Sequence, residues 1–299
     1  MSLPGGGGPT SGSGPPPVPD DLVAPRRPTL RDALHGEGAR GALIATASTL
    51  VFLAIVAVAV ISSPGWERVR ESFFDAEAFA ESFPDILSGF WVNVQMFVIA
   101  EVLVLVFALV LAVLRSIPGP VFFPLRLIAI VYTDLFRGIP TLLVILLLGF
   151  GMPALRLQGF PTSEMFWGIV ALVLVYSAYV AEVYRAGIDS VHPSQRAAAR
   201  SLGLGQWQAL RFVVLPQAVR RVIPPLLNDF VGLQKETALV AVLGVREAVR
   251  EAQIYSTSNF DYTSYLGAAL LFILVTIPLA RFTDYLIQRG RRRRESRGG

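Results

Sequence analysis

YVAEVYRAGIDSVHPSQRAAARSLGLGQWQALRFVVLPQAVRRVIPPLLNDFVGLQKETALVAVLGV, residues 179–245, is the stretch that decides the fold. An Arg-rich segment lies here between two apolar helices, and it carries apolar positions of its own, among them Leu202, Trp207, Leu210 and Val213. Arginine alternating with apolar residues is typical of an amphipathic segment. We interpret it as a loop that folds and docks on another surface.

The composition indicates a membrane protein. Hydrophobic residues make up 53% of the chain and charged residues only 16%, whereas soluble domains carry about 25% charge. Several apolar runs approach or exceed the ~20 residues that cross a bilayer. The fold class is therefore all-α polytopic membrane protein. With no Cys and only His35 and His192, neither a disulfide nor a metal site is expected.

Six transmembrane helices are predicted, at residues 42–61, about 88–114, 122–153, 162–184, 218–245 and 262–287. The fifth is interrupted by Gly and Pro. Around them we predict a disordered N-terminal tail (1–41), an acidic extracytoplasmic connector (62–87) and a basic tail (289–299). Arg clusters before the first span, after the fourth and at the C-terminus indicate that both termini are cytoplasmic. This explains the basic charge without nucleic-acid binding.

A family resemblance rests on spacing within the opening stretch. Ala197-Ala198-Ala199, Gly203, then Val213, Leu215 and Pro216 match the spacing of the EAA loop of ABC importer permeases. The wider sequence resembles the polar amino-acid subfamily, through GFWVNVQ (89–95), LFRGIP (135–140), YVAEVYRAGIDSV (179–191), ARSLGLGQWQALRFVVLPQA (199–218) and QKETALVAVLGVREAVREAQ (234–253).

The resemblance implies a type I ABC importer transmembrane domain, with a five-helix permease core over residues 88–288 and one extra N-terminal helix (42–61). It implies a permease subunit of an ATP-driven importer that moves a polar amino acid across the bacterial cytoplasmic (inner) membrane. The implied partners are an ABC ATPase dimer, an identical or related second permease, an extracytoplasmic amino-acid-binding protein and the lipid bilayer.

The coupling loop, residues 186–216, is the first candidate site. The resemblance assigns ATPase docking to Ala197, Ala198, Ala199, Arg200, Ser201, Leu202, Gly203, Leu204, Leu215 and Pro216. One departure is Ala197, which replaces the glutamate of the motif and removes one polar contact with the ATPase. The helix itself is expected to persist, because Ala has the highest helix propensity and Gly203 supplies the turn.

ATP hydrolysis is not expected on this chain. A P-loop requires G-x-x-x-x-G-K-[ST], and the only lysine, Lys235, has no such glycine pattern. We therefore expect no enzyme activity and no cofactor here, with ATP and Mg on the partner ATPase.

Ionisable and polar residues at membrane depth form the second candidate site, because such residues are costly there unless they are paired or face a cavity. The candidates for the substrate path are Lys235, Glu236, Thr237, Asn228, Glu101 and Arg137. Structural alternatives remain open: a Lys–Glu or Lys–Asp pair at Lys235, and a Glu101–Arg137 pair. Pro140 is expected to kink the third span.

A rival function is an ion-coupled secondary amino-acid transporter that needs no ATPase and uses Glu101, Asp229 and Lys235 as a charge relay. In that case the docking loop has no evident purpose.

Overall fold

The computed structural model describes residues 38–117 and 119–295, and this part of the chain contains helices and no strand. Most of the predicted N-terminal tail and the last residues of the basic tail lie outside the described residues. The chain divides into two units, residues 1–66 and 67–299. The described helix of the first unit is α2 (Gly38–Ile61), whose apolar side chains are exposed along its length. Such a uniformly apolar helix suits lipid on all sides.

The second unit begins with α3 (Trp66–Phe73) and the long helix α4 (Ala76–Ser116). Asp75 caps α4, since its carboxylate accepts hydrogen bonds from the backbone N–H groups of Glu77 and Ala78. The predicted acidic connector is therefore largely helical, and α4 starts well before the span expected at residue 88. The backbone N–H of Tyr262 donates to the carbonyl of Ser72 at 2.7 Å, which ties the region before α4 to the start of α12.

The third expected span is broken rather than kinked. Helix α5 (Phe123–Gly138) and helix α6 (Thr141–Ala154) meet at an angle of 103°. Pro140 lies at the junction, where it precedes the first turn of α6 and has no N–H to donate. The Arg137 side chain lies over the Tyr179 ring, and the Tyr179 hydroxyl donates to the Arg137 carbonyl at 3.4 Å.

Helix α7 (Glu164–Asp189) is the central helix of this unit and packs on α4, α6 and α10. Ala171, Leu172 and Val175 on α7 are fully buried. Glycines allow the closest approaches: a Cβ on Gly187 would lie 2.0 Å from Val222 Cγ2. Small residues at such contacts let membrane helices approach closely.

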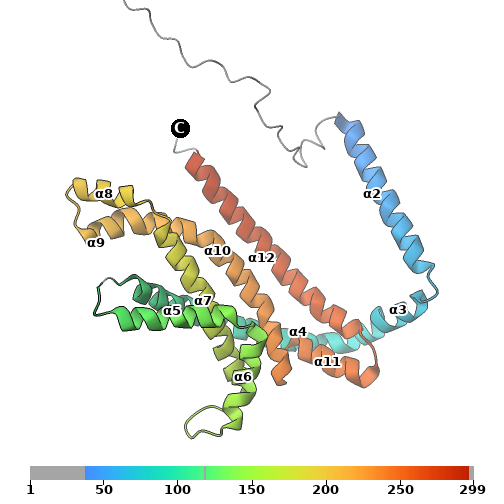
Figure 1. The fold of residues 1–299 in the computed structure, drawn as a ribbon. Helices are drawn as coiled ribbons and strands as arrows, with labels where there is room; N and C mark the ends of the chain where they lie inside the picture. Colours follow the sequence, from blue (N-terminus) through green and yellow to red (C-terminus); the bar gives the residue numbers. More distant parts are fainter. Residues whose placement is uncertain (1–37, 118, 296–299) are drawn as a thin grey trace, which may run out of the picture. The chain divides into compact units, whose positions relative to one another are not determined.

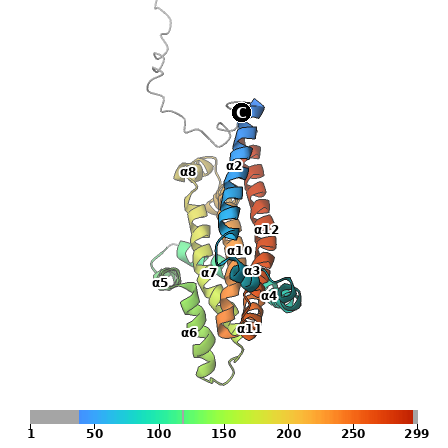
Figure 2. The same cartoon turned by 90° about the vertical axis from the view of Figure 1, so that its right-hand side faces the viewer.

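After α7 the chain forms α8 (Pro193–Ser201), α9 (Gln206–Ala209), the π-helical η2 (Leu210–Val214) and α10 (Leu215–Glu236). A 3₁₀ segment, η3 (Thr237–Leu243), ends at Gly244 with φ +90°, and α11 (Ala248–Asn259) and α12 (Thr263–Glu295) follow. Figures 1 and 2 place α8 at one end of α7, and α6 and α11 toward the other. Helix α12 runs back to the end where α8 lies.

By length and apolar composition, the described residues hold four membrane-spanning helices, or five if α5 and α6 form one bent span. The four are α2, α4 together with α3, α7, and α12. The expected fifth span, α10 with η3, is not among them. It carries Arg220, Arg221, Asp229, Lys235 and Glu236, so its polar content lowers its hydropathy.

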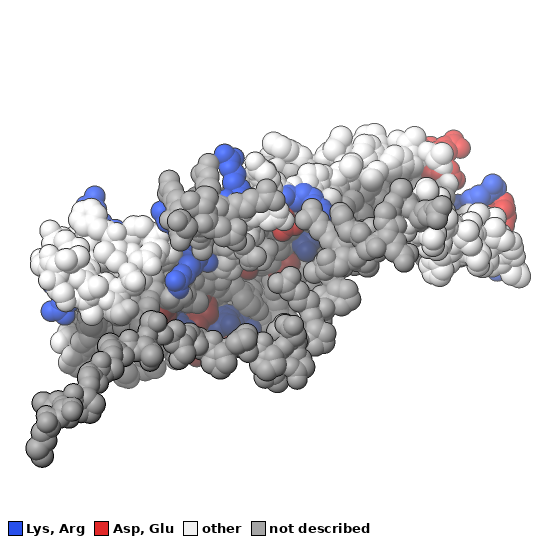
Figure 3. All heavy atoms as spheres, turned by 90° about the horizontal axis from the view of Figure 1, so that it is seen from above, with Lys and Arg blue, Asp and Glu red and all other residues white. Residues whose placement is uncertain are grey.

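The surface agrees with a lipid environment. Large apolar side chains such as Val102, Val106 and Leu109 on α4 are exposed, and in Figure 3 most of the visible atoms of the described residues belong to uncharged residues. The fold is that of an all-α polytopic membrane protein.

Candidate functional site

The expected coupling loop forms a helical hairpin, here defined as α8, the turn at residues 202–205, and α9 with η2. His192 caps α8: its Nδ1 accepts a hydrogen bond from the Ser194 N–H at 3.2 Å. Gly203 makes the turn in the left-handed region, at φ +81°, where glycine is favoured. The Leu204 N–H donates to the Ala199 carbonyl at 3.2 Å and closes the end of α8.

A small apolar cluster holds the hairpin on the helix bundle. Val191, Val214 and Ala218 are buried together, with Ile188 of α7 packed against them. The Arg221 guanidinium donates to the carbonyl of Ser190, which connects α10 to the end of α7. The hairpin is thus attached to two helices that continue into the bundle.

The hairpin also presents apolar side chains that no other described residue covers. Leu202 is 83% exposed, Trp207 69% and Phe212 63%. Ala197 and Ala198 are also exposed, whereas Ala199 is buried at 3%. Large apolar side chains that stay exposed on one short hairpin indicate a surface that binds another protein or a membrane.

An ion-pair network lies where α7 approaches the hairpin. The Glu182 carboxylate pairs with Arg115 at the end of α4, at 2.9 Å, and with Arg185 one turn further along α7. Arg185 also pairs with Asp189 at 2.6 Å. The network ties α4 to α7 near the hairpin. Sequence reasoning did not find it, because Arg115 and Glu182 are 67 residues apart.

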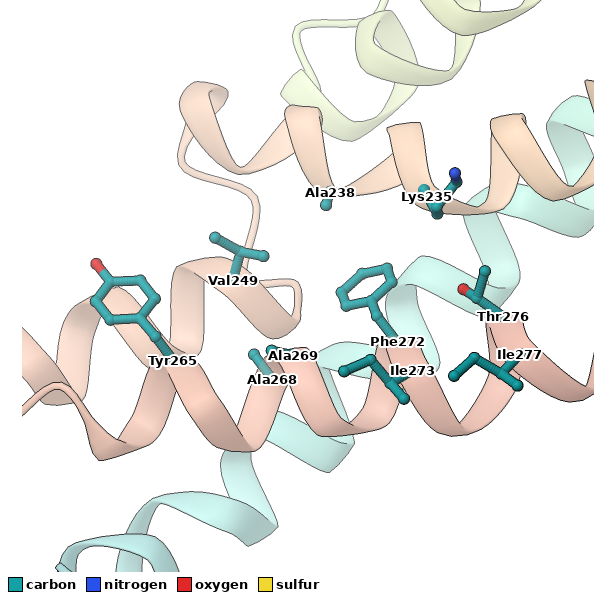
Figure 4. Close-up of a pocket in the computed structure, with 10 residues that line it drawn as sticks. All are labelled: Lys235, Ala238, Val249, Tyr265, Ala268, Ala269, Phe272, Ile273, Thr276 and Ile277. Carbon is teal, nitrogen blue, oxygen red and sulfur yellow. The ribbon is translucent and has the colours of Figure 1, made fainter. Parts of the chain in front are cut away.

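The candidate path residues of α10 and η3 point toward different neighbours. Lys235 lines an open groove together with α12 residues such as Phe272 and Thr276, which lie across from it in Figure 4. No ion pair of Lys235 occurs within residues 38–117 and 119–295, so the predicted Lys–Glu or Lys–Asp pair is not formed there. Thr237 is fully buried and accepts a hydrogen bond from Asn93 Nδ2 of α4 at 3.2 Å.

The carboxylate side chains of the candidate path have different neighbours from Lys235. Glu101 of α4 and Asp229 of α10 lie close enough for their charges to interact, and Asp229 and Glu236 both act electrostatically on Tyr176 of α7. The oxygens Asp229 Oδ2 and Glu236 Oε2 are buried with no hydrogen-bond partner among the described residues. Asn228, in contrast, is exposed.

Arg137 lies apart from these carboxylates. It is exposed at the break between α5 and α6 and forms no ion pair with Glu101 in the described structure, so the Glu101–Arg137 pair, one of the two alternatives left open for Glu101, is not formed there. The structure therefore brings Glu101, Asp229 and Glu236 toward one side of α7 and places Lys235 and Arg137 elsewhere. Also within the described residues, no group of His, Asp and Glu side chains could hold a metal ion.

A buried polar junction joins α4, η3 and α11. Asn93 Nδ2 donates to Glu247 Oε2 at 2.9 Å, and Asn93 Oδ1 accepts from the Ala248 N–H at 3.1 Å. Glu247 is fully buried, and its other oxygen caps α11 by accepting from the Arg250 N–H at 2.7 Å. Sequence reasoning missed Glu247; a Glu at the start of a helix-forming stretch was the one available signal.

Comparison of the sequence with known protein families is consistent with the arrangement of the hairpin and the helices around it. Residues 116–292 match the family described as "Binding-protein-dependent transport system inner membrane component". The match includes the hairpin, α7, α10 and α12. Membership of this family implies, in general terms, an ATPase partner and a binding protein.

Individual relatives cover about 70% of the chain. The probable amino-acid permease protein YxeN of Bacillus subtilis is 33% identical over 70% of this chain and 93% of its own length. The probable glutamine ABC transporter permease protein GlnM of the same organism is 36% identical over 70% of this chain and 94% of its own. A crystal structure of an amino acid ABC transporter with histidines superposes with a TM-score of 0.66, at 30% identity, over 72% of this chain and 98% of that one.

Proposed function

This chain belongs to the family of binding-protein-dependent transport system inner membrane components, and on that premise we propose that it is the permease subunit of an ATP-driven importer for a polar amino acid. The chain provides the passage, while ATP and Mg bind to a separate ATPase subunit. Support for the substrate class comes from relatives named for amino acids, glutamine, arginine and glutamate.

The hairpin is the observation that carries the proposal. It is anchored to α7 and α10 by buried residues and presents Leu202, Trp207 and Phe212 outward. A loop that served only to connect two helices would not need exposed apolar side chains. Such side chains on a surface loop instead indicate a binding surface. The ATPase docks here, on Ala197 to Leu204 and on Leu215 and Pro216.

The assembly follows from this docking. The chain pairs with an identical or related permease, two ATPases bind the two hairpins, and a binding protein delivers the amino acid at the opposite side of the inner membrane. Both termini lie in the cytoplasm. For the C-terminal side, this agrees with α12 ending at the same end of the bundle as α8.

The transport step couples the hairpin to the helices. Closure of the ATPase dimer moves α8, and this motion reaches α7 and α10 through the cluster of Val191, Val214 and Ala218. The substrate passes along polar groups of α4, α10 and the start of η3, for which Glu101, Asn228, Lys235, Glu236 and Thr237 are the candidates, with Arg137 at the break between α5 and α6.

Co-purification followed by transport assays tests the proposal. The chain is isolated in mild detergent from its native membrane, and co-purifying ATPase is measured for the wild type, for Trp207→Ser and for Trp91→Ser, a control exposed at 62% on α4. We expect the ATPase to be lost with Trp207→Ser alone, and uptake in liposomes to require ATP. Uptake driven by an ion gradient, with no ATPase recovered from the wild type, would establish the ion-coupled transporter instead.

A further inference from the structure

The hairpin and the first half of α10 contain basic residues and no acidic ones. Between Asp189 and Asp229 the sequence has Arg196, Arg200, Arg211, Arg220 and Arg221 but no Asp or Glu. The charge of this surface is therefore of one sign. The simplest explanation is membrane topology, because arginines are enriched in cytoplasmic loops.

The placement of two arginines goes beyond what topology requires. Arg196 and Arg200 are one helical turn apart on α8, so they share a side of this helix, and both are exposed. Neither forms an ion pair with an acid among the described residues, whereas Arg115 and Arg185 nearby are paired. Two exposed cations without an acidic partner among the described residues thus lie on α8, the helix that ends at the exposed Leu202.

Packing does not explain the missing acid. Ala199 is the buried residue of α8, and Ala197, two positions away, lies on the opposite side at 100° per residue. Ala197 is exposed, so a glutamate side chain fits at this position without displacing a neighbour. Packing within this chain therefore does not account for the absence of a carboxylate on the hairpin.

A membrane surface fits α8 less well than a protein does. An interfacial helix buries large apolar side chains about 5–10 Å into the lipid. The outward side of α8 instead carries Ala197, Ala198 and Ser201, which are small and exposed. Small residues permit another protein's backbone to approach closely.

From these observations we infer that the hairpin binds a socket on the ATPase subunit that is apolar at its centre and lined by carboxylates opposite Arg196 and Arg200. This inference rests on the proposed function and adds the chemistry of the partner surface. Its consequence is selectivity: an ATPase whose socket carries a cation, suited to a glutamate at position 197, is repelled by this chain.

Binding kinetics with the co-purified ATPase provide the first test. The wild-type chain in nanodiscs is compared with Arg200→Glu, Arg200→Lys and Arg289→Glu, the last being an exposed arginine near the end of α12 with the same charge change. We expect Arg200→Glu to slow association about 10-fold and to weaken its dependence on salt, with little effect in the other two.

Crosslinking locates the socket. Because the chain has a single lysine, Lys235, the lysine introduced by Arg200→Lys is a nearly unique amine for a carbodiimide, which joins it to a neighbouring carboxylate. We expect a crosslink to an Asp or Glu of the ATPase, mapped by mass spectrometry, and none with Arg289→Lys.

The outcomes separate the two proposals. If the wild type captures the ATPase but Arg200→Glu binds with unchanged rate and salt dependence, the carboxylate-lined socket is refuted and the proposed function stands. If Arg200→Glu instead lowers only the retention of phosphatidylglycerol, the arginines serve lipid and the inference is again refuted. If the wild type binds no ATPase, both proposals fall.

Discussion

Replacing Asn93 with alanine should weaken the contact between α11 and α4. The side chain makes three hydrogen bonds within a buried site: to Thr237 Oγ1 at 3.2 Å, to Glu247 Oε2 at 2.9 Å and from the Ala248 N–H at 3.1 Å. Asn93→Ala removes all three and leaves the fully buried Glu247 with hydrogen bonds only from backbone N–H groups at the start of α11, such as that of Arg250.

The size of the effect follows from these contacts. A hydrogen bond to a charged group is worth about 1.5–3 kcal/mol, and a buried N–H left without a partner costs about 1–3 kcal/mol. Measured values between membrane helices are smaller, averaging about 0.6 kcal/mol. We therefore expect Asn93→Ala to lower the free energy of unfolding by about 2–4 kcal/mol.

Unfolding in a titration with sodium dodecyl sulfate, followed by circular dichroism, measures this change. Gln95→Ala is the matched control, since Gln95 lies on the same helix but is exposed. A double-mutant cycle with Glu247→Gln should give a coupling energy of at least about 1 kcal/mol. If Asn93→Ala unfolds within about 0.5 kcal/mol of the control, the polar junction does not hold α11 in place and the reasoning fails.

Three further changes test other contacts. Gly89→Ala should destabilise the fold more than Gly65→Ala, because its Cβ would lie 2.6 Å from the carbonyl carbon of Glu247 while Gly65 has open space; thermal melts compare the two. Gly203→Ala should cost about 1–2 kcal/mol in the left-handed turn, leave the bundle folded by circular dichroism and reduce ATPase capture; unchanged capture would contradict the assigned turn. Glu182→Gln should lower the melting temperature, because Arg115, only 13% exposed, loses its acidic partner; the exposed Glu164→Gln should not.

Local sequence signals predicted much of this architecture. The helix class, the positions of α2, α7 and α12, and the turn at Gly203 followed from apolar run length and from glycine at a position that needs φ > 0. These features depend on residues close together in the chain. They could therefore be read without knowledge of the packing.

Features that depend on distant residues could not be predicted. Asn93 and Glu247 meet across 154 residues, and no spacing rule joins them. The direction of the Lys235 side chain could not be predicted either. Consecutive residues of a helix point about 100° apart, and the positions of α4, α7 and α12 decide which neighbour each side chain contacts. Pro140 indicated a kink, but the full break also depends on how α6 packs against α7.

The length of α4 has a mechanical consequence. Its 41 residues extend about 60 Å at 1.5 Å per residue, about twice the hydrocarbon thickness of a bilayer. Near one end, Glu81 accepts a hydrogen bond from the Tyr255 hydroxyl of α11 at 2.9 Å, and near the other, Arg115 pairs with Glu182 beside the hairpin. Pro84 lies inside α4 just after Glu81 and removes a backbone hydrogen bond there. From Pro84 onward the helix contains no further proline up to Arg115, so a force applied there reaches the hairpin end without a flexible joint in between.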